Sequence, residues 1–135
     1  ITNRISKALS LKEEGNVHFK SGELERAVRS YRRGTSALKS LNEKNTGDSQ
    51  VRALLLSLQT NLSLVCLKQG KAKMSRDVAS KALEIDETNI KALYRRGVAY
   101  RALGDVKKAS NDLRTAFKLD PENREVKREL ISLKK

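Results

Sequence analysis

The stretch that decides the fold is Gly97-Val98-Ala99-Tyr100-Arg101-Ala102-Leu103-Gly104-Asp105, followed by Ala109, Ala116 and Leu119-Asp120-Pro121-Glu122-Asn123. Small residues stand on both sides of Gly104, at the spacing where the two helices of a hairpin would cross closely. The segment therefore predicts two short helices that are joined at a glycine turn and end before the proline.

The same skeleton recurs twice upstream, at the turn glycines Gly22 and Gly70. A small residue stands seven positions before each turn glycine, and others stand five and twelve positions after it. The nine residues are Gly15, Ser63, Gly97, Ala27, Ser75, Ala109, Gly34, Ala82 and Ala116. Generic hairpins that carry small residues at their crossings are the alternative explanation. Nine small residues at nine required positions favour three consecutive repeats.

This register predicts one all-α domain over residues 1–135. The first two turn glycines are 48 residues apart and the last two are 34 apart. The 14 extra residues are expected to lengthen the flanking helices and a polar loop, because they are too many for a tight turn. The predicted parts are repeat one at about 8–41, the loop at about 42–49, repeat two at about 50–89, repeat three at about 90–123 and a capping helix at about 122–135.

Composition narrows the class of protein. Apolar residues make up 38% of the chain and aromatic residues 4%, which suits a helical stack filled by Leu, Ala and Val. No uninterrupted run of about 18 apolar residues occurs, so the sequence predicts no membrane-spanning segment. The single Cys66 cannot form an internal disulfide, which favours a reducing, cytoplasmic location. The chain opens with Ile1 and its only Met is Met74, so we expect it to be part of a longer protein.

Catalytic chemistry finds little support in the sequence. His18 is the only histidine and Cys66 the only cysteine, so neither a metal site nor a thiol–imidazole pair can be assembled. A phosphate-binding loop is also lacking. We expect a domain that is not an enzyme and that has no cofactor, no metal and no small-molecule substrate.

The first helices of the three hairpins are expected to line a concave groove. Lys12 and Asn16 are four residues apart and share a helix face, as do Lys91 and Arg95. Asn61 stands 34 residues before Arg95, at the equivalent repeat position. With 29 Lys and Arg residues in the chain, an exposed cation is common by itself. The asparagines are more telling, because Asn inside a helix gains little unless it has a partner.

These positions resemble a known family. The phrases that carry the resemblance are Lys12-Glu13-Glu14-Gly15-Asn16, then Asn61, then Lys91-Ala92-Leu93-Tyr94-Arg95-Arg96-Gly97. They look like the dicarboxylate clamp of the tetratricopeptide repeat (TPR) domains of co-chaperones, most like those of FK506-binding-protein-type immunophilins. The resemblance implies a right-handed superhelix of three TPR hairpins plus a C-terminal capping helix. It also implies an attached peptidyl-prolyl isomerase domain elsewhere in the parent protein.

The implied ligand is the extreme C-terminal tail of heat-shock protein 90 or 70, which ends in Glu-Glu-Val-Asp. Such a tail ends in two carboxylates, one on the Asp side chain and one at the free terminus, and cationic donors bind them through charge-assisted hydrogen bonds. By resemblance, Lys12, Asn16 and Asn61 hold the terminal carboxylate. Lys91 and Arg95 hold the Asp side chain and the adjacent backbone.

Two alternatives from other classes stay open. The net charge of +13 also suits a nucleic-acid-binding helical module, with Arg32-Arg33, Arg95-Arg96, Lys107-Lys108 and Lys134-Lys135 as its footprint. Against it, the basic residues are spread over every predicted helix and few aromatic residues are available for base stacking. The second alternative is that 124–135, a mixed basic and apolar segment, binds calmodulin or an acidic membrane rather than capping the last repeat.

Overall fold

The protein is all-α in the part that the computed structural model describes, residues 2–44 and 49–134. The element order there is α1 (Thr2–Lys20), α2 (Leu24–Lys44), α3 (Ser49–Lys68), α4 (Ala72–Ile85), α5 (Ile90–Ala102), α6 (Val106–Leu119) and α7 (Arg124–Lys134). The predicted fold class, three helix hairpins followed by one further helix, is confirmed.

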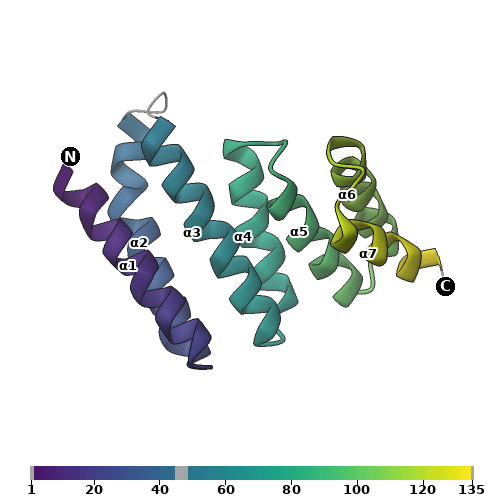
Figure 1. The fold of residues 1–135 in the computed structure, drawn as a ribbon, viewed down its shortest axis with the longest axis horizontal. Coiled ribbons are helices and arrows are strands. Elements are labelled where there is room, and N and C mark those ends of the chain that lie inside the picture. The colour runs from purple at the N-terminus through teal and green to yellow at the C-terminus, as the bar shows by residue number, and fades with distance from the viewer. Residues whose placement is uncertain (1, 45–48, 135) are drawn as a thin grey trace.

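The helices are stacked as consecutive hairpins. α1 packs on α2, α3 on α4 and α5 on α6, and each hairpin meets the next through α2 with α3 and through α4 with α5. The first helices of the hairpins also touch, α1 with α3 and α3 with α5. The hairpins therefore follow one another along the long axis of the molecule, with α7 against α6 at the C-terminal end (Figure 1).

The turns of the three hairpins share one geometry. Gly22, Gly70 and Gly104 have φ values of 78°, 78° and 86°, in the left-handed region that side chains disfavour. In the third turn, the amide of Asp105 donates to the carbonyl of Tyr100 at 2.9 Å, and the other two turns repeat this bond. The equivalence of these three glycines was the basis of the predicted register, and the structure confirms it.

Small residues allow the helices of each hairpin to approach closely. A Cβ added at Gly15 would lie 2.5 Å from the Tyr31 ring, and one at Gly97 would lie 2.8 Å from Leu113. In the second hairpin, buried Ser63 and Ser75 meet instead, and their hydroxyl oxygens are 2.8 Å apart. A larger side chain at any of these crossings would separate the helices and create a void.

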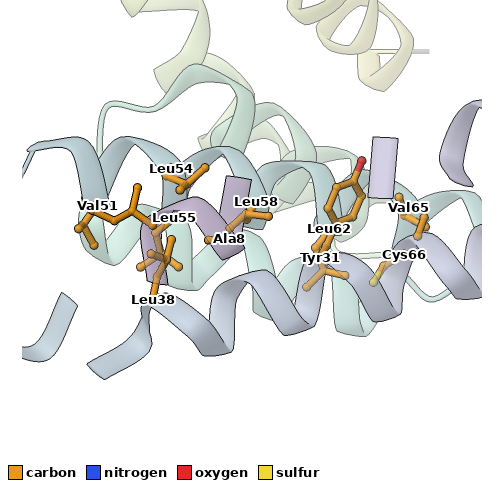
Figure 2. Close-up of a cluster of buried hydrophobic side chains, with 12 residues drawn as sticks. Ala8, Tyr31, Leu38, Val51, Leu54, Leu55, Leu58, Leu62, Val65 and Cys66 are labelled. Atoms are coloured by element: carbon orange, nitrogen blue, oxygen red, sulfur yellow. The ribbon is translucent and has the colours of Figure 1, made fainter. Parts of the chain in front are cut away.

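The main hydrophobic core surrounds α3. Its α3 members are Val51, Leu54, Leu55, Leu58, Leu62, Val65 and Cys66. Figure 2 shows Tyr31 and Leu38 of α2 lying among these side chains. By length and mean hydropathy, α3 could cross a membrane, but 56% of its most apolar 18-residue window is buried inside the protein. Its place at the centre of the core accounts for its apolar composition.

A smaller core fixes the C-terminal helix. Val126 of α7 is completely buried with Leu93 of α5 and Ala116 of α6, and Leu130 packs against this cluster. The ion pair between Arg101 of α5 and Glu129 of α7, at 2.9 Å, adds a polar link. α7 therefore covers apolar surface of the third hairpin, as predicted for a capping helix.

Two predicted boundaries were wrong by a few residues. The sequence predicts a loop over 42–49, but α2 continues through Lys44 and α3 begins at Ser49. Residues 42–44 contain neither Pro nor Gly, and extending an existing helix costs much less than starting one. Residues 45–48 lie outside the described part. α7 begins at Arg124 rather than 122, because the Asn123 side chain caps it by accepting from the Val126 amide at 3.1 Å.

Candidate functional site

The five predicted clamp residues lie on the first helices of the three hairpins, α1, α3 and α5, which we call the inner row. Lys12 and Asn16 are on α1, Asn61 is on α3, and Lys91 and Arg95 are on α5. α3 contacts both of the other helices, so the helix that carries Asn61 lies between the helices that carry the two pairs. None of the five is fully buried, so each can present part of its side chain to a ligand.

Asn16 is oriented by a tyrosine from the neighbouring helix. The hydroxyl of Tyr31, on α2, donates a hydrogen bond to the side-chain oxygen of Asn16. Burial raises the pKa of Tyr31, so the phenol keeps its proton and remains the donor. Because the oxygen of Asn16 is occupied in this way, its NH₂ group is the part left to donate to a ligand carboxylate.

Tyr31 was missed as a site residue by the sequence reasoning. The signal was present, since Tyr31 stands at the repeat position where an aromatic residue is usual and where Ala79 replaces it in repeat two. Its ring also packs against Gly15, the residue before Asn16. One side chain thus fills the first helix crossing and fixes a predicted ligand contact.

Arg95 offers a buried donor to a ligand. Its Nε is buried and has no hydrogen-bond partner among the described residues. Desolvation by burial lowers the pKa of Arg95, while Glu125 and Tyr94 act in the opposite direction. The guanidinium carbon lies 5.6 Å from the centre of the Tyr94 ring. A buried charged donor without an acceptor costs about 1–3 kcal/mol or more, which an incoming carboxylate or carbonyl would recover.

The surroundings of Lys91 differ from those of Arg95, the other predicted clamp residue on α5. It is exposed in the first turn of α5, a helix whose first turn has no acidic residue. The positive end of the helix dipole lies there, so a cation at this position is unfavourable unless an anion binds nearby. Lys91 and the amino end of α5 together favour a carboxylate at this point.

Asn61 is partly exposed, between fully or largely buried neighbours Thr60 and Leu62. The Thr60 hydroxyl donates to the carbonyl of Ser57 at 3.2 Å, so it is satisfied within α3. Asn61 therefore keeps part of its polar side chain accessible on α3, the helix that contacts both α1 and α5.

Two acidic side chains, Glu14 and Glu125, lie near the predicted clamp residues. Glu14 of α1 accepts a hydrogen bond from the Ser30 hydroxyl at 3.0 Å, which directs it toward α2. Glu125 of α7 is close enough to Arg95 and Tyr94 to affect the pKa of both. The sequence reasoning did not anticipate Glu125, because the contact between α7 and α5 spans about one repeat of chain. Among the described residues, no group of three His, Cys, Asp or Glu could hold a metal ion.

The stacked hairpins and the polar side chains on their first helices define the class of protein. It is a helical-repeat domain with polar residues along the inner row. The tetratricopeptide repeat family model matches residues 90–123. The C-terminal TPR-containing domain of a putative FK506-binding protein of Plasmodium falciparum is 30% identical, with a TM-score of 0.82 over 96% of this chain and 87% of that one. The chain belongs to the tetratricopeptide repeat family.

Two other solved structures contain chaperone peptides. The second TPR domain of human RPAP3, in complex with the HSP70 peptide SGPTIEEVD, is 30% identical, with a TM-score of 0.82 and 98% coverage of both chains. The first TPR of Spaghetti (RPAP3), bound to the HSP90 peptide SRMEEVD, is 28% identical, with a TM-score of 0.80, and covers 96% of this chain and 91% of that one.

Among curated proteins, the chain is similar to parts of larger ones. The peptidyl-prolyl cis-trans isomerase FKBP4 of Bos taurus is 32% identical over 129 residues, 95% of this chain and 28% of the relative. The protein unc-45 homolog B of Danio rerio is 32% identical over 120 residues, 89% of this chain and 12% of the relative. The chain therefore spans less than a third of the length of either.

Proposed function

We propose that this domain binds the acidic C-terminal tail of heat-shock protein 90 or 70 and acts as a co-chaperone docking module. Lys12, Asn16 and Asn61 would hold the terminal carboxylate, and Lys91 and Arg95 the side chain and backbone of the final Asp. The solved TPR domains with HSP90 and HSP70 peptides support the ligand class. The TPR fold is an interaction module, so the activity proposed is binding.

The observation that carries this proposal is the buried Nε of Arg95 without a partner. Nearly all buried donors in proteins have a hydrogen-bond partner. A buried guanidinium N–H without a partner, at a predicted ligand contact, therefore indicates where an acceptor would bind. The oriented amide of Asn16 supplies a second donor on the other side of α3. A few charge-assisted bonds, less the entropy of ordering a flexible tail, correspond to a Kd of about 1 μM, or about −8 kcal/mol.

Calorimetry with synthetic tails tests the proposal directly. We expect binding of peptides ending in Met-Glu-Glu-Val-Asp and in Ile-Glu-Glu-Val-Asp, and the ratio of their affinities reports the preferred chaperone. Amidating the terminal carboxylate removes one of the two charges that the clamp recognises, so binding should fall at least tenfold, about 1.4 kcal/mol. Equal affinity for the free and amidated peptides would contradict the proposal.

Nucleic-acid binding is the alternative that the net charge suggests. One of its expected contacts, Arg96, is already engaged by Asp112 through two hydrogen bonds of 2.7 and 2.8 Å, and it also donates to Ser80 at 3.3 Å. This leaves less of the predicted footprint for phosphates. Nucleic-acid binding would fall steeply with salt and would not depend on a peptide's free terminus.

Calmodulin or acidic-membrane binding by α7 likewise gains no support, because Val126 and Leu130 of its apolar side pack on the third repeat.

We also propose that the domain is part of a larger parent protein. Similarity to FKBP4 suggests an attached peptidyl-prolyl isomerase domain that this module would bring to a chaperone. The single, buried Cys66 is consistent with the cytoplasmic location that we propose. Localisation of the tagged full-length protein would test it.

A further inference from the structure

The outer side of the stack has a groove between α2 and α4, with α3 as its floor. Two adjoining cavities of about 450 and 340 Å³ share Thr35 and Ser36 of α2, Gln59 of α3 and Lys81 of α4. These volumes are in the range of ordinary ligand sites. We call this surface the outer groove.

The outer groove is separate from the clamp. Gln59 and Asn61 are two residues apart on α3, which is about 200° around a helix of 3.6 residues per turn. Leu55 and Leu62 also line the outer groove, at the spacing that puts them on the same side of α3 as Gln59. A ligand in the outer groove would therefore leave the clamp free.

The floor of the outer groove presents an unsatisfied acceptor. The Oε1 atom of Gln59 is buried and has no hydrogen-bond partner among the described residues, and the whole residue is 9% exposed. Leaving such an atom unpaired costs about 1–3 kcal/mol. The nearby hydroxyl of Thr35 cannot serve it, because that hydroxyl donates to the carbonyl of Arg32 at 2.8 Å. The floor therefore offers a buried acceptor to a donor on a ligand.

The walls of the outer groove are cationic. Lys39 and Lys81 line the larger cavity, and Arg32 and Lys81 line the smaller one. No ion pair links these three to a carboxylate among the residues whose side chains the structure describes. Of the two acidic residues in the lining, Asp77 is paired with Arg76 at 2.9 Å, which leaves Glu84.

The positive surface continues beyond the outer groove. A third cavity of about 460 Å³ shares Arg32 and Ser36 with it and adds Lys7, Arg29 and Arg33. An anionic ligand longer than the groove would therefore meet further cations on α2 and at Lys7 of α1.

The floor and the walls together select one ligand chemistry. We infer that the outer groove binds an extended acidic peptide segment, whose backbone N–H donates to Gln59 and whose carboxylates meet Lys39, Lys81 and Arg32. A phosphate group has acceptors but no donor for Gln59, so in a nucleic acid only a base or a 2′-hydroxyl could serve this atom. No aromatic side chain lines either cavity to stack a base. This inference does not depend on the clamp or on its ligand.

The test uses a labelled peptide of three Glu-Glu-Ala units, acetylated and amidated so that it offers the clamp no terminal carboxylate. Fluorescence anisotropy should show Lys81→Glu binding at least about tenfold more weakly, since an attraction becomes a repulsion. Lys107→Glu makes the same charge change at an exposed position of α6 and should change the affinity less than about threefold. Arg95→Met should bind the capped peptide normally.

The variant Gln59→Leu distinguishes a specific binding site from a diffuse basic surface, because it changes no charge. We expect an affinity loss of about fivefold, in line with one lost hydrogen bond. In the unchanged protein, the side-chain amide signals of Gln59 should shift in NMR spectra as the capped peptide is added, which tests the contact without any variant.

Four outcomes would overturn the inference. Equal weakening by Lys81→Glu and Lys107→Glu would indicate a response to net charge alone. Unshifted Gln59 amide signals at saturation, or unchanged affinity in Gln59→Leu, would show that water satisfies Oε1. The last outcome is that a uridine oligonucleotide displaces the peptide and also binds Gln59→Leu more weakly than the unchanged protein. These two results together would assign the groove to nucleic acid instead.

Discussion

The hydroxyl of Tyr31 on α2 donates its hydrogen bond to the side-chain oxygen of Asn16 on α1. A core aromatic residue and a predicted ligand contact are thereby joined across the first hairpin. The bond decides which end of the Asn16 amide faces outward, and a carboxylate can only be bound by the NH₂ end.

Replacing Tyr31 by Phe removes this bond and leaves the ring that packs on Gly15. Asn16 is then free to rotate its amide, so we expect affinity for a Glu-Glu-Val-Asp tail to fall about threefold to tenfold, or roughly 1 kcal/mol. Tyr100→Phe removes a hydroxyl from a partly exposed tyrosine and serves as the control. Calorimetry that finds the two variants equal would show that the orientation of Asn16 does not matter for binding.

Arg95→Met should separate stability from binding. Methionine is of similar length and has no donor to leave unpaired, so the cost of the buried Nε disappears. We expect an unchanged or higher melting temperature together with tail binding at least tenfold weaker. A clearly lower melting temperature would mean that the guanidinium is satisfied within the protein, and the main support for the clamp would be lost.

Lys91→Glu places an acid in the first turn of α5, where the helix dipole favours it. The folded domain should be at least as stable, whereas the ligand carboxylate is now repelled and affinity should drop at least tenfold. Lys107 occupies the same second position in α6, so Lys107→Glu is a matched control with the same effect on the dipole and on net charge. Unchanged tail affinity in Lys91→Glu would remove Lys91 from the proposed site.

The connection between α2 and α3 should tolerate added length. From Ser49, where α3 begins, to Asn61 is about 18 Å along the helix at 1.5 Å per residue. Inserting three glycines between Thr46 and Gly47 should therefore leave tail affinity within about twofold, because the added closure entropy is small. A large loss in calorimetry, with the circular dichroism spectrum unchanged, would mean that this connection contacts the ligand.

Truncation after Asn123 tests the capping role of α7. It exposes the apolar surface that Val126 and Leu130 cover, worth about 1.5–3 kcal/mol for each well-buried aliphatic side chain. A typical domain is stable by only about 5–15 kcal/mol, so the truncated form should melt much lower or aggregate. Thermal melts of both forms provide the measurement. Melting at the same temperature would favour α7 as a free recruitment segment.

The sequence by itself determined the repeat and its register. Turn glycines and small crossing residues are required by local backbone conformation and by close contact within one hairpin, both of which act over a few turns of helix. Gly22, Gly70 and Gly104 therefore predicted where the helices end, and the equivalence of the inner helices followed. The boundaries at residues 42–44 were less well predicted, because a polar helix end and a loop have similar composition.

Only the tertiary structure decided how the site residues are oriented and where the outer groove lies. The bond between Tyr31 and Asn16 depends on how two helices cross, and the influence of Glu125 on Arg95 depends on how α7 returns to α5. The unpaired atoms of Arg95 and Gln59 are likewise invisible in the sequence. Whether a polar atom is buried without a partner depends on every neighbour in three dimensions, and those neighbours come from helices far apart in the chain.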